Sequence, residues 1–141
     1  MKSVFIDSSV LVAACVSTKG ASAYLLGLSR KGLIKGYISR DVIGEAKKNI
    51  NFKLKDDHKK IFKIYLQYAK LGVIDEPLPE LIELCEKVIY NKDAPILAAA
   101  IQSPCQYLVT LDRKHFLTNE VAKFVKKIVI ITPGDFIKLM K

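Results

Sequence analysis

Residues 4–16 read VFIDSSVLVAACV, a short apolar run that stops at Asp7 and continues into small and apolar residues. Three β-prone residues followed by a segment of helical length predict a buried strand and then a buried helix. Asp7 lies at their junction and is the one charged residue in the stretch. The chain is therefore expected to open with a strand–helix unit of an α/β fold.

The same alternation continues along the chain. Further strands are expected at residues 36–39 (GYIS), 107–110 (YLVT) and 128–132 (IVIIT). Helices are expected at residues 21–30, 40–50, 56–71, 80–90, 93–102 and 133–141. The helix at 56–71 would bury an apolar stripe made of Ile61, Ile64, Tyr65, Tyr68 and Leu71. Short strands separated by helices predict a three-layer α/β/α sandwich with a mainly parallel central sheet, and residues 1–141 are expected to form a single domain.

The composition is that of a globular protein. Half of the 141 residues are apolar and only 7 are glycine and 5 proline, which excludes collagenous and intrinsically disordered chains. No apolar run approaches the roughly 18 residues of a membrane helix, so a soluble, cytoplasmic protein with no membrane partner is expected. Cys15, Cys85 and Cys105 stand far apart in apolar segments, which predicts buried free thiols.

The net charge of +9 is high for a chain of this length. A basic excess favours polyanionic partners such as nucleic acids, because each neutralised phosphate releases condensed counterions. A basic balance is also an ordinary way of keeping a small protein in solution. Charge alone therefore leaves nucleic-acid binding open.

Two acids follow predicted strands. Asp7 comes directly after VFI, and Asp112 comes two positions after YLVT. The carboxyl ends of parallel strands share one edge of a sheet, where α/β proteins bind their ligands. Two carboxylates from distant parts of the sequence are therefore expected to meet there.

Two further acids belong to predicted helices. Asp93 opens the apolar helix at 93–102, where an aspartate can simply cap the helix, and Asp7 can do the same for the helix after it. Glu45 lies inside a helix close to its apolar face, between Val42 and Ala46. A carboxylate beside the core needs a partner, although a solvated position at the border of that face would also satisfy it.

A cluster of carboxylates without histidines or cysteine pairs offers hard oxygen ligands, which suit Mg²⁺ or Mn²⁺ better than zinc. Packed carboxylates repel each other unless a cation neutralises them, and such a cation can activate water and stabilise charge on a phosphate. His58 and His115 are not spaced as a pair of metal ligands. Each is expected to be exposed or to lie at the rim of the site.

The basic region from Lys47 to Lys70 holds eight lysines with aromatic residues among them: Phe52, Phe62, Tyr65 and Tyr68. Lysine with aromatic residues suits a groove for single-stranded RNA, but the helical spacing also fits core or dimer contacts with a solvated lysine face. Lys47 and Lys48, close to Glu45 in the same helix, are the expected RNA contacts.

The sequence resembles the PIN-domain nucleases over nearly its whole length. FIDSSVLVAA is similar to the family's first strand and first acid, DVIGEAKKN to its glutamate-bearing helix, KDAPILAAAI to its third acidic segment and YLVTLDRKHF to its fourth. The resemblance implies that Asp7, Glu45, Asp93 and Asp112 form the catalytic, metal-binding set. It also implies that the hydroxyls of Ser9 and Thr110 orient these carboxylates.

The resemblance implies a ribonuclease that depends on Mg²⁺ or Mn²⁺ and hydrolyses RNA phosphodiester bonds. It further implies that the chain can be the toxin of a toxin–antitoxin pair, inhibited by a small antitoxin protein, and that it forms a homodimer. Several family members carry a further acid three positions after the last aspartate, where this chain has His115, so a second metal position is in doubt. The alternative is a catalytically inactive PIN-like module that binds RNA or a protein.

Overall fold

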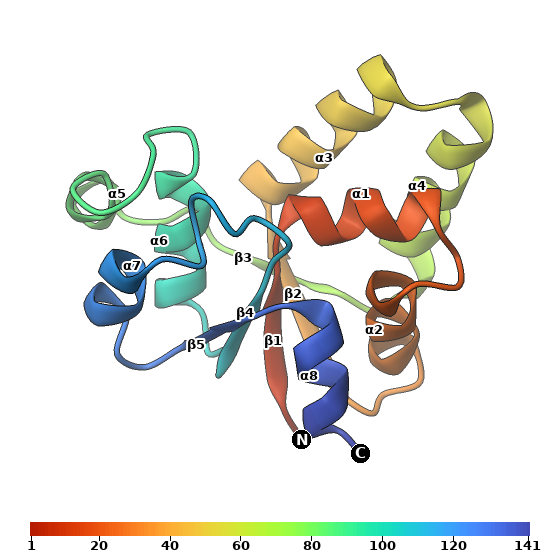
Figure 1. Cartoon of the computed structure of the whole chain (residues 1–141). Helices are drawn as coiled ribbons and strands as arrows, with labels where there is room; N and C mark the ends of the chain where they lie inside the picture. The colour runs from red at the N-terminus through yellow and green to blue at the C-terminus, as the bar shows by residue number, and fades with distance from the viewer.

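A five-stranded parallel sheet runs through the middle of the computed structural model, which describes all 141 residues (Figure 1). The strands lie in the order β3-β2-β1-β4-β5. Their bounds are β1 Ser3–Ile6, β2 Lys35–Ser39, β3 Gly72–Ile74, β4 Tyr107–Val109 and β5 Val129–Ile131. Phe5 in the central strand pairs with Tyr37 on one side and with Leu108 on the other. The order reverses between β1 and β4, which is where a parallel α/β sheet opens a crevice for ligands.

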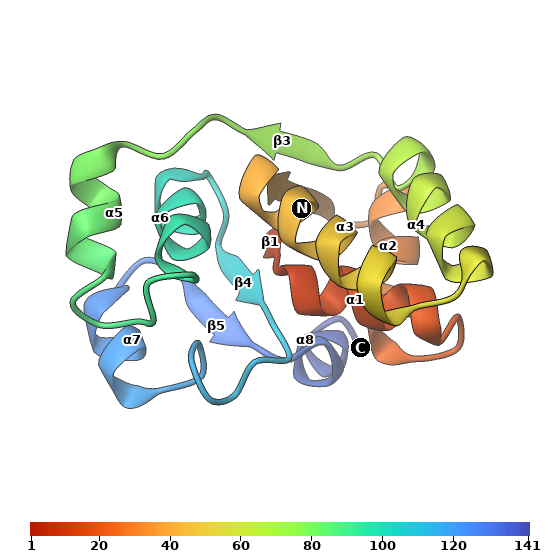
Figure 2. The ribbon, with the colours of Figure 1, turned by 90° about the horizontal axis from the view of Figure 1, so that it is seen from above.

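Helices cover both faces of this sheet. Figure 2 shows α5, α6 and α7 on one side, and α1 to α4 with α8 on the other. The bounds are α1 Ser8–Val16, α2 Ala21–Arg30, α3 Arg40–Lys53, α4 Asp56–Tyr68, α5 Pro79–Cys85, α6 Ala94–Gln102, α7 Asn119–Phe124 and α8 Pro133–Leu139. The expected α/β/α sandwich is confirmed, and every strand pair in the sheet is parallel.

The apolar strands and helices share one core. Thirty-two buried apolar residues form a single cluster, which includes the whole of β1 after its first residue. Helix α6 is buried on several sides, as its unstriped apolar sequence predicts, and Ala98, Ala99 and Ala100 have no exposed surface. The three cysteines are buried and free, and burial raises the pKa of each thiol to about 11.

None of the helices has by itself the length and the apolar composition that a membrane span requires. The pair α1 and α2, which is bent by 103°, meets that requirement only when the two helices are counted together.

Two short elements were missed in the sequence, and several helix ends differ from those expected. β3 and α7 were not expected, and the helix placed at 56–71 ends at Tyr68. Lys70 has a positive φ of 56°, which ends the helix, and Gly72 begins the edge strand β3. The helix placed at 80–90 starts at Pro79 and ends at Cys85.

The apolar stripe of α4 is rotated from its expected position. Ile64 and Tyr68 were placed on the buried side but are 53% and 56% exposed, whereas Phe62 is buried. Tyr65 faces α1 and donates a hydrogen bond from its hydroxyl to the carbonyl oxygen of Ala14 at 3.1 Å. The face that packs on the core is therefore centred on Phe62 and Tyr65, because α4 packs against α1.

Gly36 in β2 is required where α2 approaches the sheet, and its replacement by alanine tests this packing. A Cβ at this position would lie 2.7 Å from Leu71 Cδ2 and 2.9 Å from Ser29 Oγ. Gly36→Ala is expected to lower the free energy of unfolding by about 1–3 kcal/mol through overpacking. Gly27→Ala in α2, where a Cβ meets nothing within 4 Å, is the control. This substitution should raise the free energy of unfolding by about 0.5–1 kcal/mol. Urea unfolding measures both; equal effects would contradict the packing argument.

Candidate metal centre

The pairing of β1 with β4 brings two acidic segments to one edge of the sheet. Ile6 pairs with Val109, and the Asp7 amide donates to the Val109 carbonyl oxygen at 3.0 Å. Asp7 thus follows the last paired residue of β1, and Thr110 follows the last residue of β4. The prediction that the two strand ends meet is borne out by this register.

Asp7 is held in place by hydroxyl groups from both strand ends. Its side chain is buried, and its Oδ2 accepts hydrogen bonds from Ser9 Oγ at 2.7 Å and from Thr110 Oγ1 at 2.8 Å. Burial raises the pKa of this carboxyl group, and the two hydroxyl donors act in the opposite direction. Ser9 and Thr110 therefore make the contacts that the resemblance implied for them.

The same hydroxyls also fix the loop that carries Asp112. Ser9 Oγ accepts the amide of Leu111 at 3.1 Å, and Thr110 Oγ1 accepts the amide of Asp112 at 3.0 Å. Asp112 Oδ1 in turn accepts the amide of His115 at 2.9 Å, which shapes the turn that follows. Asp112 thus has a structural role in its own loop besides its place in the acidic cluster.

Asp93 is the buried acid with the least hydrogen-bonding support. It lies at the N-cap of α6, but its side chain makes no capping hydrogen bond to the helix. Burial raises its pKa to about 6, and the charges of Glu45, Asp112 and Asp7 act in the same direction, while His115 lowers it. The alternative that Asp93 serves only as a cap is therefore not supported.

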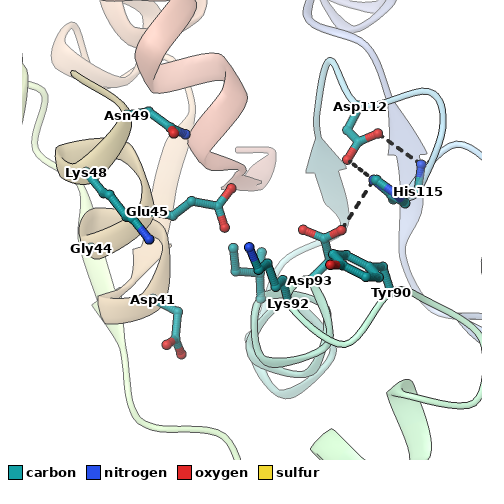
Figure 3. Close-up of a pocket in the computed structure, with 11 residues that line it drawn as sticks. Asp41, Gly44, Glu45, Lys48, Asn49, Tyr90, Lys92, Asp93, Asp112 and His115 are labelled. Atoms are coloured by element: carbon teal, nitrogen blue, oxygen red, sulfur yellow. Dashed lines mark hydrogen bonds and ion pairs between the residues drawn. The ribbon is translucent and has the colours of Figure 1, made fainter. Parts of the chain in front are cut away.

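Glu45 reaches the cluster from α3, on the opposite wall of the site (Figure 3). It is half-buried, and Ser8 at the start of α1 donates a hydrogen bond from Oγ to Glu45 Oε1 at 2.7 Å. The carboxylate beside the core thus has a polar partner, as its position required. Its second oxygen, Oε2, accepts no hydrogen bond from the protein.

His115 lies among the acids and not merely at the rim of the site. Its Nδ1 is 3.0 Å from Asp112 Oδ2 and 3.5 Å from Asp93 Oδ2. Tyr90 stacks on the imidazole ring, with centroids 5.3 Å apart and planes 21° apart. The only signal for His115 in the sequence was its spacing of three from Asp112, which places both in one turn. His58 lies in α4 and is not part of this pocket.

These side chains line an open pocket of about 640 Å³ (Figure 3). Its walls are formed by Asp41, Gly44, Glu45, Lys48, Asn49, Tyr90, Lys92, Asp93, Ile96, Asp112 and His115. Of the two lysines predicted to contact RNA, Lys48 lines the pocket, whereas Lys47 is exposed on α3 outside it. Lys92, beside Asp93 in the sequence, was not anticipated. Asp7 lies behind the lining residues, buried at the base of the cluster.

The donor set fits a divalent cation. Asp93, Asp112 and His115 each offer one ligand atom, and these three atoms lie within 4.8 Å of one another. The effect of Glu45 and Asp7 on the pKa of Asp93 places both acids within electrostatic reach. Clustered carboxylates of this kind are stabilised by a hard cation, which offsets their mutual repulsion.

Residues 3–114, which hold all four acids, match the model of the PIN domain family. The chain belongs to this family. PIN domains are generally nucleases and typically use divalent metals, which agrees with the acidic cluster. No curated protein sequence matches the chain significantly.

The PIN fold is also found in similar solved structures. A chain of VapBC2 from Rickettsia felis, bound to a DNA fragment from its promoter, matches with a TM-score of 0.68 and 17% sequence identity over 92% of this chain and 98% of that chain. A chain of FitAB bound to the IR36 DNA fragment matches with a TM-score of 0.60 and 16% identity over 92% and 94%. At these identities the likeness concerns the fold.

The raised pKa of Asp93 makes the stability of this PIN domain depend on pH. Folded Asp93 keeps its proton up to a pKa of about 6, above the ordinary pKa of 3.8 for an aspartate. The stability that this bound proton contributes is therefore full below the lower value and is lost as pH rises through the higher one. Asp93→Asn, measured by urea unfolding in EDTA, should therefore stabilise the protein more at about pH 7 than at about pH 4. Asp57→Asn, on the exposed start of α4, is the control. A stability difference that does not change with pH would contradict the assignment.

Proposed function

We propose that the chain is a ribonuclease that hydrolyses RNA phosphodiester bonds with the help of Mg²⁺ or Mn²⁺, and that Asp7, Glu45, Asp93 and Asp112 are its catalytic residues. The observation that carries the proposal is the convergence of four acids from four separate segments at the carboxyl edge of the sheet. Such convergence has no role in core packing, and burial together with the neighbouring acids raises the pKa of Asp93, so the arrangement calls for a functional reason.

Each acid has its own place in the proposed mechanism. Asp7, Asp93 and Asp112 would hold the cation, and Ser9 and Thr110 keep the Asp7 carboxylate in one orientation through the bonds to Oδ2. When bound, the ion would supply Lewis-acid polarisation of the phosphate and a water of lowered pKa. Glu45, anchored through Oε1 by Ser8, keeps Oε2 free to position the attacking water from the opposite wall.

The surroundings of the pocket suit a polyanionic polymer. The pocket is open, and Lys48 and Lys92 lie among the acids on its wall. Ammonium groups beside a negative centre attract the phosphates that flank the cleaved bond, and the net charge of +9 adds to this attraction. RNA contact by Lys47 is also proposed, at a site next to the pocket on α3. We also propose that the protein acts in the cytoplasm.

The toxin role is a further part of this proposal. The solved structures of similar fold are those of VapBC2 and FitAB, and each is bound to DNA. Their similarity to this chain supports an antitoxin partner for it. A small antitoxin protein that covers the open pocket would inhibit cleavage. A homodimer is proposed on the family resemblance.

Asp7→Asn tests the catalytic assignment. The substitution keeps the shape of the side chain but removes the charge that holds the cation, so Mn²⁺-dependent cleavage of single-stranded RNA should fall by at least about 100-fold. Asp57→Asn is the matched control and should retain full activity, since it lies on the exposed start of α4. A labelled RNA substrate with and without EDTA gives the readout.

The same assay distinguishes the main alternative. Cleavage that is unchanged in Asp7→Asn would sink the assignment and indicate a contaminating nuclease. If the protein binds RNA but no metal-dependent cleavage occurs, the chain is instead a PIN-like module without catalytic activity.

Lys48 and Lys47 provide a matched pair for RNA binding. Lys48 lines the pocket and Lys47, its neighbour in α3, does not. Lys48→Ala should weaken binding and reduce the slope of log affinity against log salt by about 0.7, the value for one phosphate contact on a single strand. Lys47→Ala should cause a smaller change. Fluorescence anisotropy in EDTA, which prevents cleavage, measures both, and an unchanged slope for Lys48→Ala would place the substrate elsewhere.

A further inference from the structure

We propose that His115 binds the catalytic cation directly through Nδ1, so that the site takes Mn²⁺ in preference to Mg²⁺. The inference rests on the metal-dependent function proposed above and specifies the ligand set of that site. It concerns a nitrogen donor in a cluster whose other ligands are carboxylate oxygens.

The distances from His115 Nδ1 to the two carboxylate oxygens are close to those between adjacent ligands on one ion. An octahedral ion with ligand bonds of about 2.1 Å holds neighbouring ligand atoms about 3 Å apart. His115 Nδ1 lies 3.0 Å from Asp112 Oδ2 and 3.5 Å from Asp93 Oδ2. Figure 3 shows the ring nitrogen directed at both carboxylates. Asp93, Asp112 and His115 Nδ1 could therefore hold one cation together after small shifts.

The imidazole is held in this orientation from two sides. Tyr90 stacks on the ring and limits its rotation, and the His115 amide is fixed to Asp112 Oδ1 at 2.9 Å. His115 and Asp112 thus form one turn, Asp112 to Phe116, closed by the bond from the Phe116 amide to the Asp112 carbonyl oxygen at 3.2 Å. A donor held in this way loses little conformational entropy when it binds an ion.

The chemistry of an imidazole donor changes the preferred ion. Mg²⁺ favours oxygen ligands and dehydrates reluctantly, whereas Mn²⁺ also suits oxygen ligands but, as a first-row transition ion, accepts an imidazole nitrogen more readily than Mg²⁺ does. Replacing one oxygen ligand by Nδ1 therefore weakens the binding of Mg²⁺ relative to the binding of Mn²⁺. A second reading of the same contacts is that a protonated His115 takes the place of a cation between the two acids; it would then compete with the metal.

Two variants of His115 separate these readings. His115→Phe keeps a ring against Tyr90 but has no donor, and His115→Asp supplies a hard oxygen instead. The control is His58→Gln, since His58 is the only other histidine and lies in α4. Mn²⁺ and Mg²⁺ are titrated into each protein by calorimetry at a pH above the ordinary pKa of imidazole, and bound Mn²⁺ is examined by pulsed electron paramagnetic resonance for coupling to ¹⁴N.

The wild type and His58→Gln should bind Mn²⁺ more tightly than Mg²⁺ and show a directly bound nitrogen. His115→Phe should lose the nitrogen coupling and at least about tenfold in Mn²⁺ affinity. His115→Asp should also lose the coupling, and its preference for Mn²⁺ should shrink. Metal binding without nitrogen coupling in the wild type, or a gain in Mn²⁺ affinity in His115→Phe, would overturn this inference but leave the proposed nuclease function standing. Failure of the wild type to bind either ion would overturn both.

Discussion

The site depends on the parallel pairing of β1 with β4. This pairing joins residues about a hundred positions apart and places Asp7 and Thr110 at the same edge, with the Asp7 amide bonded to Val109. Ser9 and Thr110 then connect the two strand ends through the Asp7 carboxylate and through the amides of the loop to Asp112. The other acids can contribute to one site only because this connection between the ends of β1 and β4 is fixed. A shift of one residue in the register would turn the side chains of β4 to the opposite face and separate Thr110 from Asp7.

Electrostatic repulsion is the cost of gathering these acids, and the structure offsets it unevenly. Asp7 is the most deeply buried of them, yet it receives two hydroxyl hydrogen bonds. Asp93 has no capping bond and is the acid whose pKa rises to about 6 under the influence of burial and its neighbours. The compensation that Asp93 lacks from the protein is what a bound cation would supply. The side chain left least satisfied by the fold is thus the one best placed to need the metal.

Much of the fold follows from local sequence, because apolar strands and helices of ordinary length fix their own type. The strand ends at Asp7 and Thr110 and the burial of α6 were predictable for this reason. β3 was not predictable, because a three-residue edge strand that begins with glycine carries almost no periodic signal. The face of α4 was also misplaced, since its aromatic residues allow more than one stripe and only packing against α1 selects the one through Phe62 and Tyr65.

The candidate site shows the same division between local and tertiary information. Asp7 and Asp112 could be placed together because strand ends converge, but the bond from Ser8 to Glu45 and the approach of His115 to Asp93 join segments whose proximity no local pattern encodes. These tertiary contacts change which of the acids have a specific structural partner in the site. Glu45 was the hardest to assign from sequence, yet it has a specific partner across the site, while Asp112 has a local reason to be aspartate in the turn that it forms with His115. The strength of the sequence signal for a residue therefore does not indicate how important that residue is in the site. Asp112 and His115 are connected by their turn whether or not a metal binds. This turn places a nitrogen atom of His115 among the carboxylate oxygens of the cluster.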